Sequence, residues 1–156
     1  MAPDDQTIIQ EITDAFDGVS REGGISLHEA EEIDCRGTPE QFAAARWLDT
    51  DQRWQDVPGT WLEEFPSVPF FLDPIGFRYY LPAYMIWSLR NEDSSSATAD
   101  NVVSCLASSP RANTLFPILS AQQRASVFKW LQAMRRRYHS SPNDAEDAIA
   151  QWRKAR

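Results

Sequence analysis

A histidine and three glutamates lie close together in the segment HEAEE, residues 28–32. On a helix, His28 and Glu32 would lie on one face and could share a metal ion, with Glu29 as a general base. The same segment also fits a capping box, in which Ser26 caps a helix and Glu29 bonds back to the cap. Because the chain has one other histidine, His139, further ligands are scarce, so we expect capping and no metal.

The two cysteines, Cys35 and Cys105, could each form a nucleophile and base pair with a histidine, but the spacing brings no such pair together. Free cysteines are usually buried, so we expect two unreactive thiols. The sequence contains no GxSxG elbow, Walker loop or GxGxxG turn. It therefore predicts no cofactor, and a binding protein in preference to an enzyme.

Three consecutive arginines, Arg135 to Arg137, could form a nucleic-acid patch. On a helix, however, successive side chains are splayed by about 100°, so the three guanidinium groups would not form one surface. The formal net charge of −8 also disfavours binding to nucleic acid. We expect Arg135 and Arg137 to pair with acidic residues from the first two-thirds of the chain, and Arg136 to point away from the core.

The aromatic segment FFLDPIGFRYYL, residues 70–81, shows a period of two and a central turn. This pattern predicts a small β-hairpin, in which Arg78 and Tyr80 share one face and Asp73 lies in the turn. A pocket beside this hairpin, with Asp73, Arg78 and Tyr80 as its polar groups, is the alternative functional site, either for a ligand or for a small enzyme.

The remaining elements are predicted to be helices, because capping residues and apolar stripes recur along the chain. Ser26, Thr38 and Ser120 each begin one. The helix from Thr38 to about residue 50 carries apolar residues that point in several directions, so we expect neighbours on more than one side. Residues 109–113 are expected to be a connector. The predicted fold class is mostly α (α+β), with about seven helices packed round a small β-hairpin.

Charge is unevenly distributed along the chain. Residues 1–100 carry 20 acidic and 6 basic side chains, whereas residues 101–156 carry 3 acidic and 9 basic. The serine-rich segment 91–99 is expected to be a flexible loop between these parts of a single domain, 1–156. No apolar run is long enough to span a membrane, and the acidic N-terminus does not resemble a secretory signal. We expect a cytoplasmic protein.

The central block FLD, residues 71–73, followed by GFRYYLPAYM, residues 76–85, is the most specific pattern in the chain. With LHEA at 27–30, Asp49 and Trp54, it resembles a family of small bacterial proteins catalogued as a domain of unknown function. The likeness spans most of the chain. It implies a bacterial, intracellular, single-domain protein, and it brings no assigned activity or catalytic residue. Thirteen arginines against two lysines are also typical of a GC-rich bacterial source.

The function predicted from these features is non-enzymatic binding of a basic protein partner. An immunity-type inhibitor that neutralises a cognate toxin is one such protein. Acidic surfaces accelerate encounters with cationic partners, and exposed aromatic side chains supply affinity. The predicted partner-binding residues are Asp49, Asp51, Trp54, Asp56, Trp61, Glu63 and Glu64. We predict no metal site, no catalytic residue and no membrane contact. A nucleic-acid regulator that uses the C-terminal helices is a weaker alternative.

Overall fold

The computed structural model describes residues 3–137 and 142–155, and within these residues it contains helices and no strand. The predicted α+β class is therefore wrong, and the described part of the chain is all-α. The α-helices are α1 (Pro3–Phe16), α2 (Leu27–Asp34), α3 (Pro39–Ala45), α4 (Gly59–Glu64), α5 (Pro74–Arg90), α6 (Thr98–Ala107), α7 (Ser109–Leu115), α8 (Ala121–Arg137) and α9 (Pro142–Ala155). Three short 3-10 helices are η1 (Arg46–Leu48), η2 (Trp54–Asp56) and η3 (Val68–Phe71).

The aromatic segment forms η3 and the first half of α5 where a hairpin was predicted. Asp73 is the N-cap of α5 and accepts a hydrogen bond from the amide of Gly76 at 2.9 Å, with Pro74 in the first turn. Nearly all side chains from Gly76 to Leu89 are buried. A helix enclosed on all sides is apolar all round and has no stripe of period 3.6, so its sequence resembles a strand.

Pro82 lies inside α5 and removes one hydrogen bond of the helix. An internal proline costs about 3 kcal/mol, whereas full burial of one large apolar side chain contributes about 1.5–3 kcal/mol. The helix buries nine large apolar or aromatic side chains: Phe77, Tyr79, Tyr80, Leu81, Tyr84, Met85, Ile86, Trp87 and Leu89. Burial therefore outweighs the cost of the proline.

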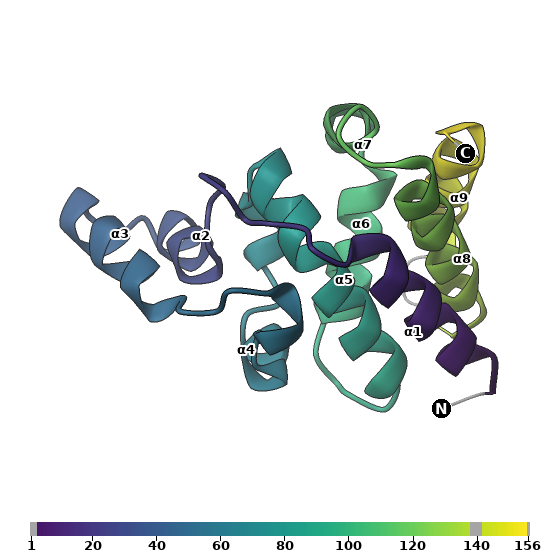
Figure 1. The fold of residues 1–156 in the computed structure, drawn as a ribbon, viewed down its shortest axis with the longest axis horizontal. Helices are drawn as coiled ribbons and strands as arrows, with labels where there is room; N and C mark the ends of the chain where they lie inside the picture. The colour runs from purple at the N-terminus through teal and green to yellow at the C-terminus, as the bar shows by residue number, and fades with distance from the viewer. Residues whose placement is uncertain (1–2, 138–141, 156) are drawn as a thin grey trace.

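Helix α5 runs through the middle of the molecule (Figure 1). On one side of it lie α1, α8 and α9, and on the other lie α2, α3 and α4, with α3 at the far end (Figure 1). Trp130 of α8 and Trp152 of α9 are fully buried and donate indole hydrogen bonds to the carbonyl oxygens of Met85 and Leu106, both at 3.0 Å. The core thus lies between α5, α6 and the two C-terminal helices.

The capping motifs at Thr38 and Ser120 form as predicted. Thr38 accepts from the amide of Gln41 at 3.2 Å, and Ser120 accepts from the amide of Gln123 at 3.1 Å. Two other predictions are wrong. Residues 109–113 belong to helix α7 and are not a connector, and α3 buries only Ala45 among its residues, so it is not enclosed on several sides.

Two of the three consecutive arginines, Arg135 and Arg137, make internal ion pairs. Arg137 bonds to Asp5 of α1, and Arg135 lies 3.3 Å from Glu146 of α9. Tyr138 and His139 lie outside the described residues. None of the described helices is long and apolar enough to cross a membrane.

The two thiols differ in accessibility, which corrects the prediction that both are buried. Cys35 is exposed, and its hydrogen bond to Glu31 raises the pKa of the thiol. Burial raises the pKa of Cys105 to about 12. We expect a disulfide reagent at pH 8 to modify one thiol per folded chain, Cys35, and the second only in denaturant, as measured by released thiolate absorbance. Fast reaction of both thiols in the folded protein would contradict this burial.

Candidate functional site

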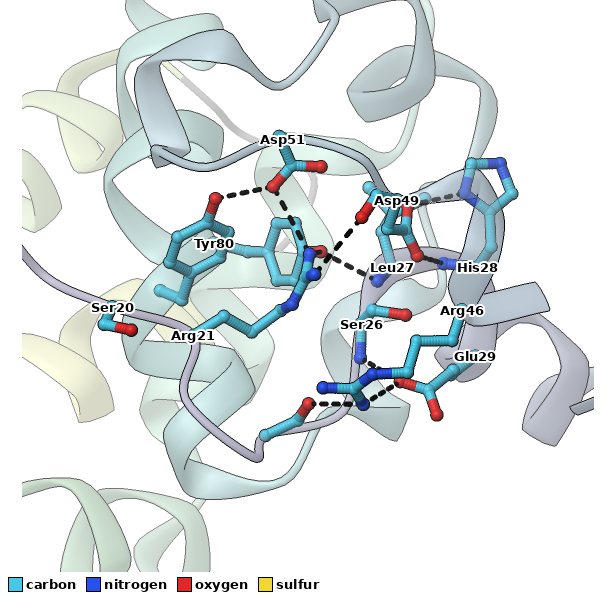
Figure 2. Close-up of polar contacts among 12 residues, drawn as sticks. Ser20, Arg21, Ser26, Leu27, His28, Glu29, Arg46, Asp49, Asp51 and Tyr80 are labelled. Atoms are coloured by element: carbon cyan, nitrogen blue, oxygen red, sulfur yellow. Dashed lines mark hydrogen bonds and ion pairs between the residues drawn. The ribbon is translucent and has the colours of Figure 1, made fainter. Parts of the chain in front are cut away.

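The N-terminus of α2 is capped by groups from distant parts of the chain (Figure 2). The amide of Leu27 donates to the Tyr80 hydroxyl at 3.0 Å, and the amide of His28 donates to Oδ2 of Asp49 at 2.9 Å. The amide of Ser26 donates to Oε1 of Glu29 at 2.9 Å, as the capping motif predicted, whereas the Ser26 hydroxyl is buried without a hydrogen-bond partner among the described residues. Free amides at a helix N-terminus favour a carboxylate or another acceptor. Because Tyr80 belongs to α5 and Asp49 follows η1, these contacts hold α2 against both of them.

Arg21 connects the same groups from the other side (Figure 2). Its Nη1 donates to the Tyr80 hydroxyl at 3.0 Å and lies 3.3 Å from Oδ2 of Asp51, while Nη2 donates to the carbonyl oxygen of Asp49 at 3.2 Å. The hydroxyl of Tyr79 donates to the same carboxylate oxygen of Asp51 at 2.5 Å. The result is a buried network that links the loop before α2, the residues after η1 and the middle of α5.

The pair in this network that most resembles part of a catalytic site is His28 with Asp49. Nδ1 of His28 lies 2.7 Å from Oδ1 of Asp49, and the imidazole packs edge-on against Trp61, with ring centroids 4.7 Å apart. A histidine oriented by a carboxylate is part of many catalytic triads. Among the described residues, however, no serine, threonine or cysteine hydrogen bonds to His28, and no group of three His, Cys, Asp or Glu could hold a metal. The pair acts as a structural link.

The network fixes η1 at both ends. Before Trp47, Arg46 pairs with Oε1 of Glu29 at 2.8 Å and donates to the carbonyl oxygen of Gly24 at 3.3 Å. After Leu48, Asp49 is held by His28 and Arg21. Between these two anchors, Trp47 is 84% exposed and Leu48 is 57% exposed. A tryptophan is thus held out into solvent on a backbone that is fixed on either side of it.

Ile33, 38% exposed, is the third large apolar residue exposed in this region. Ile33 lies one turn after Glu29 on the same face of α2. Glu29 in turn pairs with Arg46, the residue before Trp47. We call Ile33, Trp47 and Leu48 the Trp47 patch. Of the large apolar side chains that are exposed in the described residues, only Phe70 lies elsewhere.

The patch belongs to an acidic lobe, which we define as residues 27–64. The lobe contains ten acidic and three basic residues. Two of the three basic residues, Arg46 and Arg53, already pair with Glu29 and Asp56 of the lobe itself. The exposed or partly exposed carboxylates near the patch come from α2 and α3: Glu31, Glu32, Asp34 and Glu40. The lobe that carries Trp47 therefore has an excess of negative charge.

The predicted partner-binding residues occupy two kinds of position. Asp49 and Asp51 belong to the buried network. Trp54 is 3% exposed and donates to the carbonyl oxygen of Phe16 at 2.9 Å. None of these three residues therefore offers its side chain to a partner. Trp61 is partly buried against His28. The remaining three carboxylates are exposed: Asp56, which pairs with Arg53, Glu63, which bonds to Ser94, and Glu64.

The alternative set does not form one site. Asp73 caps α5 and accepts from the amide of Ile25, Arg78 contacts Ile118 and Glu22, and Tyr80 joins the buried network. Residues two apart on a helix point about 200° apart, whereas on the predicted strand Arg78 and Tyr80 would have shared a face. The hairpin on which this arrangement of the three residues depended does not form.

Sequence reasoning missed Arg21, Tyr79 and Trp47. Nothing local marks Arg21, because its partners lie about 30 and 60 residues away. The signal for Trp47 was present but misread: a short helix with apolar residues on several faces also occurs where one of those faces is exposed.

The tyrosines of α5 give a pH-dependent prediction. Burial, reinforced by the carboxylates of Asp51 and Asp49, raises the pKa of Tyr79 and of Tyr80 above the usual value, and burial is also the main cause that raises the pKa of Tyr84. The unfolded chain loses these protons near pH 10, whereas the folded chain keeps them. The contribution of these tyrosines to the free energy of unfolding should therefore be constant below pH 9 and fall as the pH rises above about 10.

Absorbance at 295 nm checks this expectation directly. In the folded protein, at most one of the four tyrosines should ionise with a pKa near 10, and the others only as the protein unfolds. Ionisation of three or four tyrosines near pH 10 without loss of helical circular dichroism would contradict the burial of this network.

No curated protein and no solved structure matches the chain. A family model does match, over residues 4–156, and its description is a family of unknown function, DUF6714. This match confirms the resemblance seen in the sequence. The chain therefore belongs to the family of unknown function DUF6714.

Proposed function

We propose that the protein is a non-enzymatic binding protein that docks on a basic protein partner through the Trp47 patch of its acidic lobe. One observation carries this proposal: Trp47 is 84% exposed on a backbone anchored on both sides. Tryptophan is among the residues that contribute most to protein interfaces. A side chain whose backbone is already ordered loses less conformational entropy on binding.

Charge specifies the kind of partner. The lobe has a net charge of −7, so a basic surface with an apolar pocket for Trp47 complements it. A symmetric dimer through this patch would place two lobes of the same sign against each other. The role that fits best is inhibition of a basic toxin in the cytoplasm of a bacterium, by direct coverage of the toxin.

A site-specific photo-crosslinker tests the proposal. Placed at Ala44, an exposed position of α3, it reports on partners of the Trp47 patch, and placed at Arg136, an exposed position of α8, it serves as the control. The partner captured from host cells at Ala44 would then be purified and titrated against this protein. We expect a basic protein that crosslinks at Ala44 but not at Arg136, and that is lost in the Trp47→Ala background.

Three outcomes would count against the proposal. These are capture that does not depend on Trp47, an acidic partner, and self-association through Trp47 detected by light scattering. Raising the salt concentration from 50 to 500 mM should also slow association with the purified partner, because salt screens charges beyond about one Debye length. A rate that does not change with salt would contradict the part assigned to the acidic lobe.

A further inference from the structure

A second feature, separate from the Trp47 patch, is a cavity of about 450 Å³ between α1, η2, α4 and α5. Apolar surface comes from Trp54, Val57, Leu62, Ala83, Ile86 and Trp87, and polar surface of similar extent comes from Thr13, Gln55, Arg90 and Asn91. A cavity of this size is within the range of small-molecule sites. The two indoles offer flat surfaces for a ring or a short hydrocarbon chain.

The indole N–H of Trp87 distinguishes this cavity from ordinary packing. Trp54, Trp130 and Trp152 are also buried, and each donates to a backbone carbonyl oxygen. Trp87 is 7% exposed, and among the described residues no group accepts a hydrogen bond from its indole nitrogen. That nitrogen lies near Gly59, another residue of the cavity wall. The nitrogen is not among the buried atoms that lack a partner, so solvent reaches it, and a ligand in the cavity can take the place of that water.

Arg90 supplies a second donor at the rim. It lies three residues after Trp87 on α5, so the two side chains are neighbours on the helix surface. Arg90 is exposed and forms no ion pair within the described residues. Glu63, Glu92 and Asp93 line an adjacent hollow with it, but none of them pairs with it within 4 Å. Its guanidinium group therefore remains available to an acceptor in the cavity.

We propose that this cavity binds a small organic acid with a flat or short apolar body. The carboxylate would accept from Arg90 and from the indole N–H of Trp87, since neither donor has an acceptor among the described residues. The apolar body would lie against Trp54 and Ile86. This site is independent of the docking surface, because no residue of the Trp47 patch lines it.

Nuclear magnetic resonance with defined probes tests the site. Phenylacetate, indole-3-acetate and hexanoate would each be titrated into ¹⁵N-labelled protein, with phenylacetamide as the neutral match of phenylacetate. The indole N–H signal of Trp87 is assigned by its absence in Trp87→Phe. We expect at least one acid to shift this signal in a saturable way, and phenylacetamide to bind at least about tenfold more weakly than phenylacetate if phenylacetate is that acid.

Variants separate the carboxylate contact from the cavity. Arg90→Gln changes an exposed residue and should weaken the acid about tenfold. Gly59→Val should abolish binding by filling the cavity, whereas Gly59→Ala should retain it, because a Cβ there meets Trp87 at 3.5 Å, an ordinary contact. Circular dichroism confirms folding, and Trp47→Ala should bind the acid normally. No shift with any of the three acids, or equal affinity in Arg90→Gln, overturns the proposal.

Discussion

Replacement of Asp51 by alanine should lower the free energy of unfolding by about 3–5 kcal/mol, measured by urea denaturation at pH 7. The side chain of Asp51 is 3% exposed, and it holds both Arg21 and the hydroxyl of Tyr79. Without it, the guanidinium of Arg21 loses its carboxylate and the Tyr79 hydroxyl loses its acceptor. An uncompensated buried charge is the largest cost that a single substitution in this network can produce.

The matched control is Asp56→Ala. Asp56 lies five residues further along and also pairs with an arginine, Arg53, but both side chains are largely exposed. Exposed pairs contribute little to stability, so we expect no measurable loss. Equal effects of Asp51→Ala and Asp56→Ala would show that the network does not carry the stability assigned to it.

A double variant tests the cause of the loss. Arg21→Met in the Asp51→Ala background removes the charge that Asp51→Ala leaves behind, so part of the lost stability should return. The original pair is imperfect, because Nε of Arg21 and Oδ1 of Asp51 are buried without hydrogen-bond partners among the described residues. Purely additive losses in the double variant would contradict a charge-based explanation.

Replacement of Trp47 by alanine should weaken the complex with the captured partner by about 2–4 kcal/mol, or roughly 30- to 1000-fold in Kd. Because the side chain is 84% exposed in the free protein, the free energy of unfolding should change by less than about 0.5 kcal/mol. Isothermal titration calorimetry measures the first quantity and urea denaturation the second. Loss of binding with no loss of stability is the signature of a contact residue.

Phe70→Ala is the control for this prediction. Phe70 is 45% exposed and lies on η3, outside the acidic lobe, so its removal should leave the Kd within about twofold, which corresponds to less than 0.5 kcal/mol. If Phe70→Ala weakens binding as much as Trp47→Ala, the partner contacts exposed apolar residues without preference for the lobe.

The parts of the fold that the sequence predicted are those specified by local contacts. The starts of α2, α3 and α8 follow from Ser26, Thr38 and Ser120, because each motif involves residues three apart in the chain. The sequence did not predict that α5 is a helix. Its apolar residues occur on all sides because neighbouring elements enclose it completely, and a local sequence pattern does not reveal those neighbours. Its cap, Asp73, and Pro74 were helix-start signals that were interpreted as a turn.

The Trp47 patch that we propose as the site lies in the acidic segment singled out from the sequence, but its residues differ from the predicted ones. An acidic segment with tryptophans is visible in the sequence, and the exposed patch does lie within it. Which tryptophan is exposed depends on long-range packing: Trp54 is buried because its indole meets Phe16, and Trp47 is exposed because α3 has few neighbours. The burial of Asp49 and Asp51 likewise depends on Arg21, which lies about 30 residues away.

Hydrogen exchange of the purified complex, compared with the free protein, tests the central claim most directly. If the Trp47 patch is the binding surface, the strongest protection on complex formation should fall within residues 33–48, and α8 and α9 should exchange as in the free protein. Protection confined to α8 and α9, with residues 33–48 unchanged, would contradict the proposed surface.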